Sequence, residues 1–132
     1  MPGSRPELFE KGLRSEADLV FLDLEDSVAP AAKDAARRAV CQALQEMDWR
    51  GRPRTVRINP VDSPYWYRDL VELVAATGGA VDIVIVPKVN SPADVAAVTR
   101  LLETLEAACG RVEPIALEVQ IETARGLVEV EA

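Results

Sequence analysis

Three carboxylates lie within four residues at the end of an apolar run in the stretch "DLVFLDLEDSVAP", residues 18–30. Asp23 and Glu25 are two residues apart, so on a strand their side chains point to the same face, and Asp26 follows directly. Two like charges that lie close together repel each other, and the repulsion grows as water is excluded. The spacing therefore indicates a strand end built around a cation or a set of hydrogen-bond donors.

Three more residues that could carry chemistry follow other apolar runs. They are Arg57 in "TVRIN", Lys88 in "VPKV" and Glu122 in "EVQIE". The chain has no histidine, which excludes a Ser-His-Asp triad, a Cys-His dyad and a histidine-ligated metal. Any metal site must therefore use oxygen ligands, which suit Mg²⁺ or Mn²⁺.

Each of these residues also has a structural explanation that the sequence leaves open. Glu122 fits the first turn of a helix, where the helix dipole favours an acid. Arg57 lies between buried positions and needs an anionic partner, which is either a nearby carboxylate or a ligand. Lys88 fits a salt bridge better than a Schiff-base nucleophile. Asp26 fits a turn or a helix cap.

Four apolar runs rich in Val, Ile and Leu predict parallel strands buried on both faces. They are Leu19–Leu24, Thr55–Ile58, Val81–Val86 and Ile115–Ile121. Three segments between them carry apolar residues at helical spacing and predict helices over Ala31–Met47, Pro64–Ala76 and Pro92–Ala108. Ser63-Pro64 and Ser91-Pro92 predict the starts of the last two helices, and Gly78 and Gly110 predict their ends.

The predicted strands recur about every 30 residues, which is the size of a βαβ unit. Such a repeat predicts an α/β fold, either an open doubly wound sheet or part of a (β/α)8 barrel. The chain opens on the loop "MPGSRP" and stops within an apparent new helix, "GLVEVEA". We therefore expect residues 1–132 to form the N-terminal half of a (β/α)8 barrel domain that is incomplete at both ends. In either fold the functional side chains gather at the carboxyl ends of the strands.

Composition excludes several other classes of protein. Hydrophobic residues make up 48% of the 132 residues, and no apolar run approaches the roughly 18 residues of a spanning helix. The net charge of −7 argues against a sequence-independent nucleic-acid binder. The two cysteines, Cys41 and Cys109, are too few for a disulfide framework, so we expect free thiols in a reducing cytoplasm.

Five ordered motifs give the chain a resemblance to a known family. "PGSRPELFEK", "LDLEDSVAPAAKDAAR", "VRIN", "VPKV" and "IETARGL" together resemble the HpcH/HpaI aldolase and citrate lyase beta-subunit family. Within this family, "SPYWYRDLVELV" looks most like the branch that acts on malyl-CoA. The resemblance implies a (β/α)8 barrel that acts on an acyl-CoA thioester through Mg²⁺, in homotrimers or hexamers.

The resemblance also implies roles for individual residues. Glu122 would be one of two carboxylates that bind Mg²⁺, the second lying beyond Ala132. Arg57 would bind the substrate carbonyl or carboxylate, and Arg5 and Lys11 would hold the phosphates of CoA. In addition, Glu25 and Asp26 would accept hydrogen bonds from metal-bound water.

The implied reaction is a retro-Claisen cleavage of malyl-CoA, or of β-methylmalyl-CoA, to glyoxylate and acetyl-CoA or propionyl-CoA. Alternatives within the family are a citramalyl-CoA lyase and a citrate lyase beta subunit. Three alternatives lie outside the family. They are a Schiff-base aldolase using Lys88, a receiver-like phosphoacceptor domain, and a non-catalytic fragment or interaction module. Because the half-barrel supplies one of two expected metal carboxylates, we expect residues 1–132 alone to be inactive.

Overall fold

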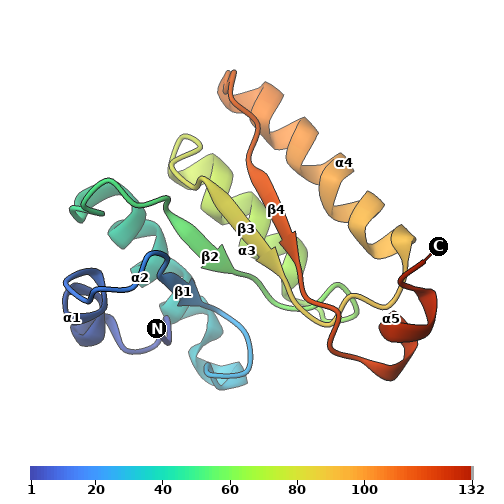
Figure 1. The fold of residues 1–132 in the computed structure, drawn as a ribbon. Helices are drawn as coiled ribbons and strands as arrows, with labels where there is room; N and C mark the ends of the chain where they lie inside the picture. Colours follow the sequence, from blue (N-terminus) through green and yellow to red (C-terminus); the bar gives the residue numbers. More distant parts are fainter. Residues whose placement is uncertain (132) are drawn as a thin grey trace.

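The computed structural model describes residues 1–131 and shows strands alternating with helices (Figure 1). The strands are β1 (Phe21–Asp23), β2 (Thr55–Arg57), β3 (Ile83–Val86) and β4 (Ala116–Val119). The helices are α1 (Phe9–Leu13), α2 (Lys33–Glu46), α3 (Trp66–Val71), α4 (Pro92–Cys109) and α5 (Ala124–Glu129). Short 3₁₀ turns, Pro6–Leu8 and Pro30–Ala32, precede α1 and α2, and a π-helical turn, Glu72–Ala76, extends α3.

The four strands form one parallel sheet in the order β1-β2-β3-β4. All four predicted strands are therefore confirmed, although each is shorter than its apolar run. In a doubly wound sheet the chain reverses direction about its first strand, which gives an order such as 2-1-3-4-5. Sequential order is the order of a (β/α) barrel, so the open doubly wound alternative, and with it the receiver-like domain, is wrong.

One face of the sheet packs against the helices and forms the core. Leu22, Val56 and Val84 share one row of the strand register and are fully buried on this face. The helices α2, α3 and α4 follow one another along this side (Figure 1). Their buried apolar side chains are Ala36, Val40, Ala43, Leu44, Leu70, Leu73, Val74, Val98 and Leu102, as the helical spacing predicted. Burial of each large side chain contributes about 1.5–3 kcal/mol, so this layer supplies much of the driving force for folding.

The predicted helix boundaries are confirmed for α4 and for the end of the segment that α3 begins, which stops at Ala76 just before Gly78, but not for the start of α3. Ser91 and Asp94 form a capping box at the start of α4, and Gly110, with φ 72°, ends it. The prediction that α3 begins at Ser63-Pro64 is wrong, because α3 begins at Trp66. The Ser63 hydroxyl instead accepts a hydrogen bond from the backbone N of Tyr65 at 3.3 Å, a local turn that competes with helix capping.

The opposite face of the sheet carries the polar side chains. Asp23 and Arg57 lie directly opposite each other in the register of β1 and β2, and Ile85 and Glu118 continue the same row on β3 and β4. The guanidinium of Arg57 also lies over the ring of Phe21, 5.4 Å from its centroid. The sheet therefore separates an apolar, helix-covered face from a face whose charges gather at the carboxyl ends of the strands.

Both cysteines are free thiols, as predicted: Cys41 is buried and Cys109 is partly buried. Burial raises the pKa of the Cys41 thiol to about 11, which keeps it protonated at neutral pH.

Among residues 1–131, no helix is both long and apolar enough to cross a membrane.

Candidate active site

Arg57 and Asp23 form the centre of the charged cluster. Nε of Arg57 donates to Oδ1 of Asp23 at 2.8 Å, and Nη2 donates to Oδ2 at 3.0 Å. This is a bidentate pair, which fixes the plane of the guanidinium as well as its position. The Asp23 side chain is only 4% exposed, while that of Arg57 is 20% exposed. The buried carboxylate therefore fixes an arginine whose side chain is partly open to solvent.

The chain immediately after β1 holds Asp23 in place. The backbone N of Glu25 donates to Oδ1 of Asp23 at 3.0 Å, and the Ser27 hydroxyl donates to Oδ2. Burial alone would raise the pKa of Asp23, but the hydrogen bonds from Arg57, Ser27 and Glu25 N outweigh it and hold the pKa below its ordinary value. Asp23 is therefore an anion that orients Arg57.

Glu25 lies on the same side as Asp23, as the strand spacing predicted. Its Oε2 is 3.3 Å from Nη1 of Arg57, and its Oε1 is 2.8 Å from Nζ of Lys88. The Glu25 side chain is 3% exposed, and no donor within residues 1–131 makes a hydrogen bond of good geometry to Oε1. Oε1 is therefore held by the Lys88 ammonium as an ion pair, and its remaining lone-pair capacity can accept from a further donor such as an ordered water.

Lys88 is a second cation that pairs with the carboxylates at this strand end. Its Nζ also lies 2.7 Å from Oδ2 of the exposed Asp26. The hydrogen bond to Asp26, together with the ion pair to Glu25, raises the pKa of Lys88, which keeps it charged. A charged lysine is not a nucleophile, so the geometry disfavours the Schiff-base aldolase. The cations that pair with the carboxylates at this strand end are thus Arg57 and Lys88.

Glu122 follows β4 and is exposed. Its Oε1 accepts a hydrogen bond from the backbone N of Lys88 at 3.1 Å, and its charge contributes to the raised pKa of Arg57, whose largest cause is the hydrogen bond to Asp23. The next residue fixes this loop, because the Thr123 hydroxyl donates to Oδ1 of Asn90 at 2.7 Å and accepts from Gly126 N at 2.9 Å. Glu122 therefore lies with Arg57 and Lys88 at the carboxyl ends of the strands, a region called the mouth below.

The donor set at this mouth fits a hard divalent cation, although it does not enclose one. The part of the chain that the structure describes, residues 1–131, contains no group of three or more His, Cys, Asp or Glu side chains that could hold a metal ion. Glu122 offers one carboxylate on the open side, whereas the carboxylate of Glu25 is paired with Arg57 and Lys88. Mg²⁺ usually keeps several waters and takes only one or two carboxylates, so Glu122 could be one of its ligands.

The N-terminal loop passes beside the end of β1. Gly3 N donates to Asp23 O at 2.7 Å, and a Cβ at Gly3 would lie 2.9 Å from that oxygen, so only glycine allows this approach. The loop carries Arg5, which is exposed and paired with Glu7, and Lys11 is exposed on α1. Their predicted contact with CoA phosphates stays a prediction.

Sequence reasoning missed a buried network beside this site. Asp69 on α3 is 1% exposed; its Oδ1 accepts from Nε of Arg37 at 2.9 Å, and its Oδ2 accepts from the backbone N and Nδ2 of Asn59 at 2.9 and 2.7 Å. The sequence did contain a signal of buried charge, because Lys33 and Arg37 fall on the apolar face of α2.

Lys33 supports the end of β1 separately from this network. Its Nζ donates to the carbonyl oxygens of Leu24 and Glu25 at 2.7 and 2.8 Å.

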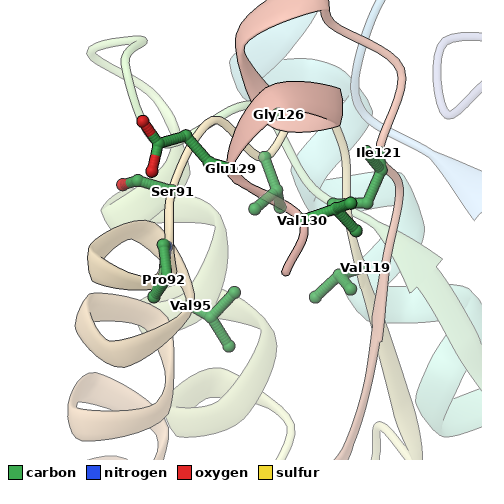
Figure 2. Close-up of a pocket in the computed structure, with 9 residues that line it drawn as sticks. Ser91, Pro92, Val95, Val119, Ile121, Gly126, Glu129 and Val130 are labelled. Atoms are coloured by element: carbon green, nitrogen blue, oxygen red, sulfur yellow. The ribbon is translucent and has the colours of Figure 1, made fainter. Parts of the chain in front are cut away.

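A separate apolar pocket of about 210 Å³ lies between α4, β4 and α5 (Figure 2). Figure 2 shows Val95, Val119 and Val130 around it, with Ser91 and Glu129 among the lining residues. Its lining contains no cationic side chain, so it does not resemble a phosphate site. The charged cluster, and not this pocket, is the candidate active site.

The chain is similar to one known family over its full length and to named proteins over most of it. The family model described as HpcH/HpaI aldolase/citrate lyase matches residues 1–132. Proteins named L-malyl-CoA/beta-methylmalyl-CoA lyase from Cereibacter sphaeroides and Rhodobacter capsulatus are 49% and 50% identical over 130 residues, 98% of this chain. A citrate lyase subunit beta from Haemophilus influenzae is 37% identical, over 84% of this chain and 37% of its own length. The chain spans 41% of the length of the first two relatives.

Solved structures match the fold. RipC from Yersinia pestis has a TM-score of 0.68 at 27% identity, over 99% of this chain and 48% of its own. A malate synthase from Haloferax volcanii, in a lead(II) complex, has a TM-score of 0.81 at 16% identity, over 95% of this chain and 39% of its own. At that identity the second match shows the fold alone. With the sequential strand order, these matches confirm the predicted (β/α) barrel fold.

Proposed function

The chain belongs to the HpcH/HpaI aldolase/citrate lyase family, and on that premise we propose that it contributes to a carbon–carbon lyase acting on a 3-hydroxyacyl-CoA. The proposed substrates are malyl-CoA and β-methylmalyl-CoA, which give glyoxylate and acetyl-CoA or propionyl-CoA, or form from them in reverse. Identity of 49% to a lyase of that name supports this branch over a citrate lyase beta subunit, at 37%. A citramalyl-CoA lyase stays the nearest alternative.

The observation that carries the proposal is the anchored guanidinium of Arg57. Asp23 uses Nε and Nη2, and Nη1 lies 3.3 Å from Oε2 of Glu25, so of the five N–H groups on the guanidinium those not directed at these two carboxylates can meet a substrate. In the cleavage, the substrate hydroxyl loses its proton, the C2–C3 bond breaks, and the electron pair moves onto the thioester to form an enolate. A preoriented donor aimed at the thioester oxygen stabilises that charge as it develops.

The other roles follow from the chemistry of the donor set. Glu122 would hold Mg²⁺, or Mn²⁺ in its place, and Glu25 and Asp26 would accept hydrogen bonds from its waters. When bound, the metal would act as a Lewis acid toward the oxygens of the hydroxy acid. Arg57 would bind the substrate carbonyl or carboxylate, and Arg5 and Lys11 would hold CoA phosphates.

The proposal extends to the setting of the site. We propose that residues 1–132 form part of a (β/α)8 barrel lyase domain that assembles as a homotrimer or hexamer. Two free thiols, one of them buried, fit a reducing compartment such as the cytoplasm.

A direct assay tests the proposed reaction. The protein that carries residues 1–132 is incubated with malyl-CoA and Mg²⁺, and released glyoxylate is trapped as its phenylhydrazone. We expect glyoxylate release that EDTA abolishes and that borohydride with substrate leaves intact. Release that resists EDTA together with borohydride inactivation would replace this proposal with the Schiff-base aldolase. Faster turnover of citramalyl-CoA than of malyl-CoA would shift it to the neighbouring branch.

A further inference from the structure

Lys88 has an unusual backbone conformation at the end of β3. Its φ is 51°, and within residues 1–131 only one other non-glycine residue, Arg50, has a positive φ. This region is unfavourable for side chains with a Cβ, and such residues persist only where their surroundings hold them. Two sets of contacts hold Lys88.

The first set joins the loop after β3 to the loop after β4. In its left-handed conformation, Lys88 donates its backbone N–H to Oε1 of Glu122 at 3.1 Å. Beside it, Val89 N donates to Gln120 O at 3.2 Å. Gly126 lies so close that a Cβ there would be 2.1 Å from Val89 O. The two loops are therefore joined by hydrogen bonds and a close backbone approach, and the Lys88 peptide N–H is the group that contacts the Glu122 carboxylate.

The second set joins the same residue to the end of β1. Nζ of Lys88 lies 2.8 Å from the buried Glu25 and 2.7 Å from Asp26. The Lys88 side chain is 35% exposed, whereas the Glu25 side chain is 3% exposed, so removal of the ammonium takes one of two cations from a buried carboxylate. One residue thus contacts carboxylates from the segments that follow β1 and β4.

We propose that Lys88 is a positioning residue: its backbone N–H orients the Glu122 carboxylate for a divalent cation, and its ammonium pairs with Glu25 and Asp26 hold the left-handed backbone that this requires. The inference rests on the proposed function, because it assigns Lys88 a part in metal binding at Glu122. It separates two roles that one residue combines, a backbone role toward Glu122 and a side-chain role toward Glu25 and Asp26.

Three substitutions at Lys88 separate these roles. Lys88→Arg keeps the cation, Lys88→Gly removes it but tolerates the positive φ, and Lys88→Ala removes it and disfavours that φ. Arg50→Ala is the matched control, because Arg50 has a φ of 55°, is exposed and lies in the loop before β2, at the amino ends of the strands. The probe is Mn²⁺ alone, titrated into the protein that carries residues 1–132 and followed by electron paramagnetic resonance. Urea unfolding of each variant is measured in parallel.

We expect Lys88→Ala to weaken Mn²⁺ binding by about tenfold or more, as loss of groups that orient metal ligands usually does. Lys88→Gly should bind at least about fivefold more tightly than Lys88→Ala, because glycine has no cost at this φ. Lys88→Arg and Arg50→Ala should bind Mn²⁺ as the unmodified protein does. If Lys88→Ala does not fold, weaker binding in Lys88→Gly than in Lys88→Arg supports the same conclusion.

The outcomes distinguish this inference from the function on which it rests. Unchanged Mn²⁺ binding in Lys88→Ala and Lys88→Gly would overturn the positioning role and leave the proposed lyase intact. Equal weakening in Arg50→Ala would also overturn it, since the loss would then be a general effect of backbone strain. Failure of the unmodified protein to bind Mn²⁺ would overturn the metal site itself.

Discussion

Asp23 and Arg57 are register partners on β1 and β2, and their side chains make two hydrogen bonds of 2.8 and 3.0 Å. A second pair with the same geometry lies near the other end of the sheet. There Nε and Nη2 of Arg54 lie 3.0 and 3.1 Å from the carboxylate oxygens of Asp82. The two pairs differ in place, because only Asp23–Arg57 lies where the carboxyl ends of the strands meet Glu122.

The first prediction is that Arg57→Lys lowers turnover by about 10²- to 10³-fold, as loss of one oxyanion donor does. Lysine keeps the positive charge opposite Asp23 but loses the planar fork that aims a second donor at substrate. Steady-state kinetics with malyl-CoA measure the fall, and urea unfolding measures stability. Arg54→Lys is the control, since it removes an equivalent fork and should leave turnover unchanged. If Arg57→Lys and Arg54→Lys lose the same stability and keep the same activity, Arg57 forms only a structural ion pair.

The second prediction concerns stability in acid. The folded pKa of Asp23 lies below its unfolded value of about 3.9, so its contribution to stability is present above that pH and is lost as pH falls through the folded pKa. Asp23→Asn should therefore lower the free energy of unfolding at pH 7 and flatten its dependence on pH below about 4. Urea unfolding at a series of pH values between 2 and 7 measures both effects. Parallel curves for Asp23→Asn and the unmodified protein would show that Asp23 has no lowered pKa.

The third prediction concerns the buried network around Asp69. Asp69→Ala leaves the buried Arg37 without its main partner and removes the carboxylate that accepts from the backbone N and Nδ2 of Asn59, so it should destabilise the fold by about 3–5 kcal/mol. Asp34 also pairs with Arg37, at 3.0 Å, but its side chain is 68% exposed. Asp34→Ala should therefore cost only about 0–1 kcal/mol. Similar costs for the two variants would contradict the idea that burial sets the value of this network.

The strand and helix order could be predicted because apolar periodicity is a local property. The buried face of α2, for example, follows from the spacing of Ala36, Val40 and Leu44 alone. The start of α3 could not be predicted, since the Ser63 hydroxyl has a local alternative to capping.

The details of the site depend on contacts between distant residues. Lys88 pairs with Asp26 across 62 positions, which no spacing reveals. Its positive φ has no sequence signal either, because lysine is not a residue type that favours that region.

The last prediction is that Glu122→Gln sharply raises the Mg²⁺ concentration needed for activity and lowers turnover. The amide keeps an oxygen that can accept the Lys88 N–H, so the local fold should persist while the charge that attracts a hard cation is lost. Activity against Mg²⁺ concentration measures the shift, and urea unfolding checks that stability is unchanged.

Glu103→Gln is the matched control for this change. Glu103 is exposed on α4 and pairs only at the surface with Arg100, so its loss removes the same charge without touching the strand ends. If Glu122→Gln and Glu103→Gln respond alike to Mg²⁺, Glu122 does not bind the metal and is instead the acid of a helix start. A selective loss in Glu122→Gln would separate a ligand from a surface charge, because both substitutions change the net charge equally.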